Sequence, residues 1–205
     1  MNAELKNSIK LCGTVCAAPA ANNNPGFGGL ISFPLEISRL SGTVDRLNVH
    51  VPESLTAGLC LEAGERVRIS GEIRSQNEPG TNGRSRLIIF VFADGIEFAG
   101  ADVRDENEVE LIGVICKEPT FRSTPSGRKI CDVMLAINRP RGKSNYLPAI
   151  AWGRCAYELS DCPVGTVISL YGRLQSRKYI KKHSETFSEE RTAFEISAIT
   201  VDTNI

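Results

Sequence analysis

The chain has 205 residues, of which 41% are hydrophobic, and its 24 basic residues balance its 24 acidic ones. That length allows one large domain or two small ones, and the composition excludes a disordered chain, a collagen-like chain and a long coiled coil. No segment approaches the roughly 18 uncharged apolar residues of a membrane span, and the first residues lack the pattern of a secretory signal. We therefore expect a cytoplasmic protein without a membrane association.

The sequence repeats itself with a period of about one hundred residues. The register continues through residues 35–39 against 135–139, and through 71–75 against 172–176. Such a repeat predicts two copies of one domain, residues 1–104 and 105–205, joined near residues 100–106. Five residues of the first copy recur 100 positions later: Asn7, Leu11, Gly13, Cys16 and Pro19 match Asn107, Leu111, Gly113, Cys116 and Pro119.

In chain order, both copies show the two-residue alternation of half-buried strands. In the first copy the strands are expected at 9–15, 33–37, 67–73 and 88–92, and in the second at 133–137, 168–174 and 194–199. Gly71 and Gly172, inside their strands, predict bulges or sharp bends. One short helix is expected in each copy, at 53–61 and at 154–160. The pattern predicts an all-β protein of two tandem five-stranded Greek-key barrels; a sandwich fits the strand count but not the helix.

The seven cysteines are scattered and odd in number, which predicts reduced side chains packed as small apolar residues. Cys12 and Cys16 would suggest a metal site if a second ligand pair were near. However, neither His50 nor His183 has a cysteine at ligand-like spacing. We expect no metal and no cofactor.

Charge is distributed unevenly between the copies. Residues 121–182 contain twelve basic and three acidic residues, whereas the matching residues 21–82 contain five basic and seven acidic ones. The second copy can therefore hold a polyanion, for which the first is poorly suited, unless the cations serve solubility alone. Eight of them are expected to contact phosphates: Arg139, Arg141, Arg154, Arg173, Arg177, Lys178, Lys181 and Lys182.

Aromatic residues lie among these cations. Tyr146 and Trp152 are on or beside expected strands, and Tyr179 is in an expected loop. The first copy has Arg46 and Pro52 at the first two matching positions and an expected loop without aromatics, residues 76–83, at the third. Single-stranded nucleic acid is held by a basic groove for its phosphates and flat rings under its bases. The alternative is that Trp152 and Tyr146 fill the barrel core.

At these residues the second copy resembles the bacterial single-stranded DNA-binding protein family, with its oligonucleotide-binding (OB) barrel. The segments that carry the resemblance are 107–113, 124–127, 135–139, 151–154 and 171–179, and the Gly-Arg-Leu-x-x-Arg-Lys-aromatic motif is the most specific of them. In the family, the aromatics that match Tyr146, Trp152 and Tyr179 stack on bases. The resemblance thus implies binding of single-stranded DNA without sequence specificity, in replication, recombination or repair, near the nucleoid.

The chain departs from the family pattern in three places. Residues 138–141 read Asn-Arg-Pro-Arg where the family commonly has another stacking aromatic. The sequence ends at Ile205, so we expect no acidic tail of the kind with which the family recruits repair enzymes. Most members have one barrel per chain, so two barrels resemble the members in which a homodimer supplies four. The first copy fits the family weakly, and we expect it to serve structure or oligomerisation.

Two other functions stay open. Single-stranded RNA is a second possible ligand, because stacking and phosphate contacts do not test for the 2′-hydroxyl. A primosomal-type OB protein, whose main role is protein–protein interaction, is the alternative that the missing tail favours. An enzyme is not expected, since the nearest catalytic cluster, His183, Ser184 and Glu185, lacks a strand-to-helix nucleophile turn.

Overall fold

A computed structural model describes residues 4–21, 29–79, 85–182 and 188–205. Within these ranges no helix is long and apolar enough to cross a membrane. The strands of the first copy are β1 (Lys6–Val15), β2 (Ala20–Ala21), β3 (Leu30–Ser38), β4 (Val44–Pro52), β5 (Arg66–Pro79) and β6 (Ser85–Phe98). Those of the second copy are β7 (Glu106–Ile115), β8 (Thr120–Ser123), β9 (Lys129–Arg139), β10 (Lys143–Trp152), β11 (Val167–Lys182) and β12 (Ser188–Asp202). The helices of the described residues are α1 (Glu53–Thr56), α2 (Arg154–Ser160) and a 3-10 turn, Pro140–Gly142.

Both copies close into five-stranded barrels, as the sequence predicts. In the first, neighbouring strands pair in the order β3-β4-β6-β5-β1, and a further pairing of β1 with β3 closes the ring. The second repeats this order with β9, β10, β12, β11 and β7. One contact in each ring is parallel: β4 pairs with β6 in the first ring, and β10 pairs with β12 in the second. The predicted all-β fold of two tandem OB barrels is therefore confirmed.

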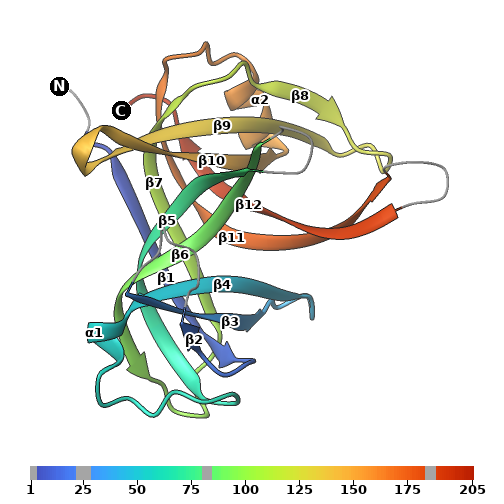
Figure 1. Cartoon of the computed structure of the whole chain (residues 1–205). Coiled ribbons are helices and arrows are strands. Elements are labelled where there is room, and N and C mark those ends of the chain that lie inside the picture. Colours follow the sequence, from blue (N-terminus) through green and yellow to red (C-terminus); the bar gives the residue numbers. More distant parts are fainter. Residues whose placement is uncertain (1–3, 22–28, 80–84, 183–187) are drawn as a thin grey trace.

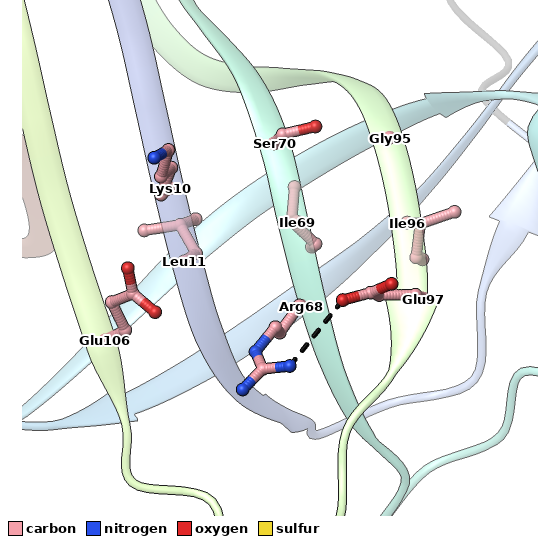
Figure 2. Close-up of a pocket in the computed structure, with 9 residues that line it drawn as sticks. All are labelled: Lys10, Leu11, Arg68, Ile69, Ser70, Gly95, Ile96, Glu97 and Glu106. Atoms are coloured by element: carbon pink, nitrogen blue, oxygen red, sulfur yellow. Dashed lines mark ion pairs between the residues drawn. The ribbon is translucent and has the colours of Figure 1, made fainter.

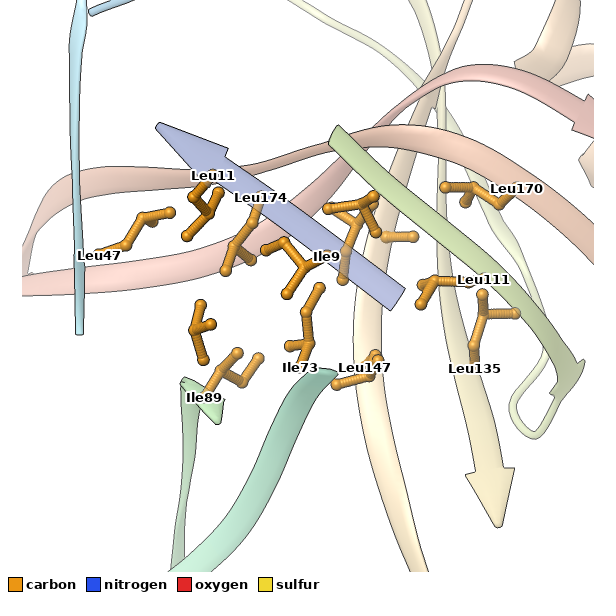
Figure 3. Packing of buried hydrophobic residues seen from close by; sticks show 14 of the residues in the cluster. Ile9, Leu11, Leu47, Ile73, Ile89, Leu111, Leu135, Leu147, Leu170 and Leu174 are labelled. Atoms are coloured by element: carbon orange, nitrogen blue, oxygen red, sulfur yellow. The ribbon is translucent and has the colours of Figure 1, made fainter. Parts of the chain in front are cut away.

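The core follows from the alternation of apolar residues along the strands. Ile9 and Leu11 of β1 and their counterparts Val109 and Leu111 of β7 are fully buried or nearly so. Figure 3 shows side chains from both copies packed in one cluster, which includes Ile9 and Ile73 of the first copy and Leu111 and Leu147 of the second. Burial of each such side chain stabilises the fold by about 1.5–3 kcal/mol.

The residues that recur between the copies have a structural reason. The Asn7 side-chain amide accepts from the Ile73 backbone N–H (3.0 Å) and donates to the Ile73 carbonyl (2.7 Å). Asn107 makes the same two contacts with Leu174, at 2.9 and 2.7 Å. These asparagines fix the first strand of each barrel to the long strand beside it.

The two copies are joined by strand pairing as well as by the linker. β1 and β7 pair in antiparallel fashion, from Lys6↔Ile112 to Cys12↔Glu106, so that the two barrels form one continuous sheet of twelve strands. An ion pair between Lys6 and Glu110 bridges these two strands. In Figure 1 the β5–β6 hairpin rises from the first copy toward β10, and the β11–β12 hairpin projects beyond β4. Each copy therefore reaches onto the other.

Three local predictions were wrong. Tyr179 is in β11 rather than in a loop, and residues 76–79 continue β5, because both hairpins extend far beyond their barrels. Their arms are solvated on both faces, so they lack the apolar alternation that marks a strand. The helix expected at 53–61 ends at Thr56, shortly before Gly58, whose φ of 87° lies outside the helical region.

Candidate nucleic-acid interface

The three aromatic residues singled out in the sequence are on the surface. Tyr146 is 45% exposed, and Trp152 and Tyr179 are each 37% exposed. The alternative that Tyr146 and Trp152 fill the barrel core is therefore wrong. A half-exposed ring keeps one flat side available for a base.

Tyr146 and Trp152 share the outer face of β10. Leu147 between them is fully buried, so the even-numbered residues of this strand point away from the core. Six residues of extended strand separate the two rings by about 20 Å along the chain. They therefore lie along one line and do not stack on each other.

Tyr179 reaches the same outer face through β12. Ile150 of β10 is opposite Ser197 of β12, and Tyr179 of β11 is opposite Arg191 of the same strand. Because alternate residues of a strand share a face, all four point to one side of the sheet. The hydrogen bond that the Arg191 guanidinium donates to Glu189 raises the pKa of this arginine, and Tyr179 adds a smaller contribution in the same direction.

Two of the predicted cations are on this face of β11. Arg173 is opposite Ser197 and Arg177 is opposite Ala193, both of which share the parity of Arg191. The Arg173 Nε is buried and has no hydrogen-bond partner among the described residues. The Arg177 Nε lies 3.9 Å from a carboxylate oxygen of Glu195, so this cation is loosely paired.

The other predicted cations are distributed differently. Lys178 is on the opposite side of β11, 2.9 Å from Glu190. Arg154 starts α2, and its Nε lies 2.7 Å from a carboxylate oxygen of Glu158 on the next turn; the Arg154 side chain is nevertheless highly exposed. The backbones of Lys181 and Lys182 belong to β11 and that of Arg141 to the 3-10 turn, but these three side chains lie outside the described part of the structure.

Two matched hydrogen bonds join the copies, each from a residue near the start of β4 or β10 to a long strand of the other copy. The Asp45 Oδ1 accepts from the backbone N–H of Ser176 at 2.8 Å, and the Asn145 Oδ1 accepts from that of Ser75 at 3.1 Å. The Ser75 Oγ in turn accepts from the backbone N–H of Tyr146 at 2.7 Å. The first copy thus holds in place the strand that presents Tyr146.

A groove between the copies was not predicted from the sequence. A hollow of about 690 Å³ is lined by β4 of the first copy and by the β11–β12 hairpin of the second. A neighbouring hollow of about 310 Å³ brings Pro148 and Tyr179 together with Arg86 of β6. Arg86 and Asn48 line both hollows, so the two adjoin, and together we call them the groove. The groove's cations are Arg46, Arg86, Arg177, Lys178 and Arg191, and its acids are Glu189 and Glu190.

The first copy contributes two of these cations. Arg46 is at the position that matches Tyr146, and a guanidinium plane stacks on bases as a ring does. Neither Arg46 nor Arg86 has an ion pair within the described residues, whereas Arg191 and Lys178 pair with Glu189 and Glu190. The sequence signal for Arg46 was present, but Arg86 lies four residues beyond the segment whose charge was counted.

Another hollow, of about 400 Å³, lies away from the groove, against β1, β5 and β6 (Figure 2). Its charged side chains neutralise one another in part, with Arg68 3.7 Å from Glu97. None of the predicted site residues lines it. This hollow is therefore separate from the groove.

The cysteine and histidine side chains are also candidates for catalytic groups or metal ligands. The cysteines are all free, and burial raises the pKa of the Cys131 thiol to about 11. Burial also lowers the pKa of His50, whose ring lies 4.4 Å from that of Phe90, to about 4. Over the described residues, no group of His, Cys, Asp and Glu side chains could hold a metal ion. His183, Ser184 and Glu185 lie outside the described residues.

Comparisons with known proteins relate the chain to one family. The model of the single-strand binding protein family matches residues 106–203. The chain is 24% identical to a single-stranded DNA-binding protein of Thermus aquaticus, over 87% of this chain and 78% of that protein. It is 30% identical to single-stranded DNA-binding protein B of Bacillus subtilis, over 36% of this chain and 71% of that protein.

A solved structure supports the fold of the whole chain. The crystal structure of the wild-type single-stranded DNA binding protein from Thermus aquaticus superposes with a TM-score of 0.77 at 21% identity. The superposition covers 99% of this chain and 95% of the other. With the family match over the second barrel and the Bacillus relative, the chain belongs to the single-strand binding protein family.

Proposed function

We propose that this chain binds single-stranded DNA without sequence preference and protects it during replication, recombination or repair. The observation that carries the proposal is that Tyr146, Trp152 and Tyr179 are exposed on one outer face of the second barrel, with cations between them. A base of any identity has a face to stack, so this surface does not read sequence. The role is binding, without catalysis.

The DNA strand crosses the outer face of β10, β12 and β11. Bases stack on Trp152, Tyr146 and Tyr179, each contributing about 1–3 kcal/mol. Phosphates approach the predicted cations that share this face, Arg173 and Arg177. Counterion release makes the affinity fall as salt is raised.

The first copy supports binding from the groove. Arg46 and Arg86 have no ion pair within the described residues, and they line the hollow of about 690 Å³ together with residues of the β11–β12 hairpin. We therefore assign the first copy two tasks: it fixes β10 through Ser75, and it adds phosphate contacts. A homodimer of such chains would present four barrels.

A primosomal-type assembly protein is the second candidate function. It would need surfaces for protein partners and would make little use of exposed rings among cations. The aromatic face favours DNA binding as the main role. Single-stranded RNA remains the competitor ligand that an experiment has to distinguish, since the groove shows no feature that reads a 2′-hydroxyl.

The groove is tested by removing its two first-copy cations. We expect Arg46→Gln with Arg86→Gln to weaken binding of a labelled dT oligomer about tenfold near 0.1 M salt. We also expect the slope of log affinity against log salt to become shallower by about 1.4, which corresponds to two lost phosphate contacts. Fluorescence anisotropy over a series of salt concentrations measures both quantities.

The matched control removes two positive charges outside the groove. Arg68, which pairs loosely with Glu97 at the other hollow, and the exposed Arg104 are replaced by glutamine in the same way. The control should bind nearly as the unmodified chain does. Equal losses for both double variants would show that total charge matters and that the groove does not.

A further inference from the structure

Arg39 and Arg139 are matched residues of the two barrels with different electrostatic partners. Each ends a Leu-x-Ile-x-Arg segment, and each is followed six residues later by the side chain that joins the copies. That side chain is Asp45 in the first copy and Asn145 in the second. Both are fully buried and both are opposite an isoleucine of the preceding strand, so their settings are alike.

In the first copy, the carboxylate neutralises the arginine. The Arg39 guanidinium donates to both Asp45 oxygens, at 2.7 Å from Nε and 2.5 Å from Nη2. This hydrogen bond raises the pKa of Arg39. A bidentate, largely buried pair leaves Arg39 little capacity to hold another anion.

In the second copy, the amide leaves the arginine without a counter-ion. The Asn145 Oδ1 is used by the Ser75 N–H, while the Asn145 Nδ2 is buried and has no partner within the described residues. The Arg139 Nε is likewise buried and unpartnered there. In the first copy, the Arg39 Nε donates to the Asp45 Oδ2. In the second copy, the corresponding atoms are the Arg139 Nε and the Asn145 Nδ2, which are both donors and cannot pair with each other.

The charges around Arg139 add to this imbalance. Burial and then the charge of Arg74, on β5 of the first copy, lower the pKa of Arg139, while Glu72 raises it. Glu72 is already engaged, because Arg74 donates to it at 2.6 Å. Ser75, the residue after Arg74, accepts from the backbone N–H of Tyr146, so the segment of the first copy whose charges act on Arg139 also holds β10.

We infer that the Asp-to-Asn difference between the copies turns a structural ion pair into an anion-binding point, so that Arg139 takes a phosphodiester oxygen while Arg39 does not. The inference rests on the proposed function for the identity of the anion. It names Asn145 as a positioning residue: it joins the copies through Oδ1 and keeps Arg139 free by carrying no charge. The same barrel motif thus serves structure in one copy and ligand binding in the other.

The test is an isosteric exchange, Asn145→Asp. The new carboxylate keeps the acceptor for the Ser75 N–H and supplies Arg139 with the partner that Arg39 has. We expect the melting temperature to stay the same or rise and the affinity for a labelled dT oligomer to fall about tenfold, the effect of one charge-assisted contact. The salt slope should become shallower by about 0.7, one single-strand phosphate contact.

Two further variants make the result specific. Asn204→Asp adds the same charge at an exposed position near the end of the chain and should bind as the unmodified protein does. Arg139→Gln should lose about as much affinity as Asn145→Asp, and the double variant no more than either, because both remove one contact. Unchanged binding by Asn145→Asp, additive losses, or a lower melting temperature for Asn145→Asp would overturn the inference.

A DNA-free readout separates this inference from the proposed function. Inorganic phosphate should raise the melting temperature of the unmodified chain more than that of Asn145→Asp, because the carboxylate occupies the anion point. If dT oligomers fail to bind the unmodified chain while this difference persists, the proposed function falls and the anion point stands. If oligomers bind and the difference is absent, the reverse holds.

Discussion

Replacing Trp152 by alanine should weaken binding to poly(dT) by about 5- to 150-fold, the equivalent of the 1–3 kcal/mol that one stacked base contributes. Trp152 ends β10 on its outer face and is 37% exposed, so its removal takes a base platform from the surface and leaves the core intact. Isothermal titration or anisotropy at fixed salt measures the loss. The melting temperature should change by no more than a few degrees.

The matched control is Phe98→Ala. Phe98 is an exposed ring as well, at 45%, but it ends β6 of the first copy and does not line the groove. Its removal should leave the affinity unchanged. Trp152→Phe should recover most of the lost binding, because it restores a flat ring. Wild-type affinity in Trp152→Ala would contradict the stacking role.

Gly172→Ala is expected to give a large loss of stability, about 3 kcal/mol. A β-carbon at this position would lie 2.3 Å from the Ser197 carbonyl oxygen and 3.0 Å from its carbon, and neither backbone atom can move without breaking the β11–β12 ladder. The ladder shifts its register between Tyr171 and Gly172, so the bulge depends on this close approach. Urea unfolding measures the difference.

Gly127→Ala is the informative comparison. Gly127 has a φ of 80°, which disfavours an alanine by about 1–2 kcal/mol, but a β-carbon there would meet no atom within 4 Å. We therefore expect Gly127→Ala to cost less than Gly172→Ala. A Gly172→Ala protein as stable as the unmodified chain would show that β11 and β12 separate easily at the bulge.

The sequence was sufficient for the barrels but not for how the two copies join. The alternation of apolar residues predicted the strands, and the repeated glycines predicted the bulges at Gly71 and Gly172, because these features depend on local chemistry. The β1–β7 ladder depends on the choice of partner strand, which the hydrophobic pattern does not specify. A signal was present in the charges: Lys6 and Lys10 are basic where the matching Glu106 and Glu110 are acidic.

The site was predicted in part for similar reasons. The sequence predicted that Tyr146, Trp152 and Tyr179 are available for stacking, and all three are exposed. The groove could not be predicted from either copy alone, because residues of both copies line it. Arg46 and Arg86 line the groove, and so become candidate site residues, because the β11–β12 hairpin of the other copy is packed near β4. Their role depends on the contact between copies, which a charge count within one copy does not register.

The most direct measurement uses Trp152, the one tryptophan of the sequence, as its own reporter. Tryptophan fluorescence is followed while poly(dT) is added at low salt, and then while sodium chloride, duplex DNA or poly(U) is added as a competitor. Capture of an unpaired strand by this face predicts saturable quenching that salt reverses and that an equal amount of duplex does not; competition by poly(U) would extend the ligand to RNA. Fluorescence that ignores poly(dT), or that duplex DNA quenches equally well, would contradict it.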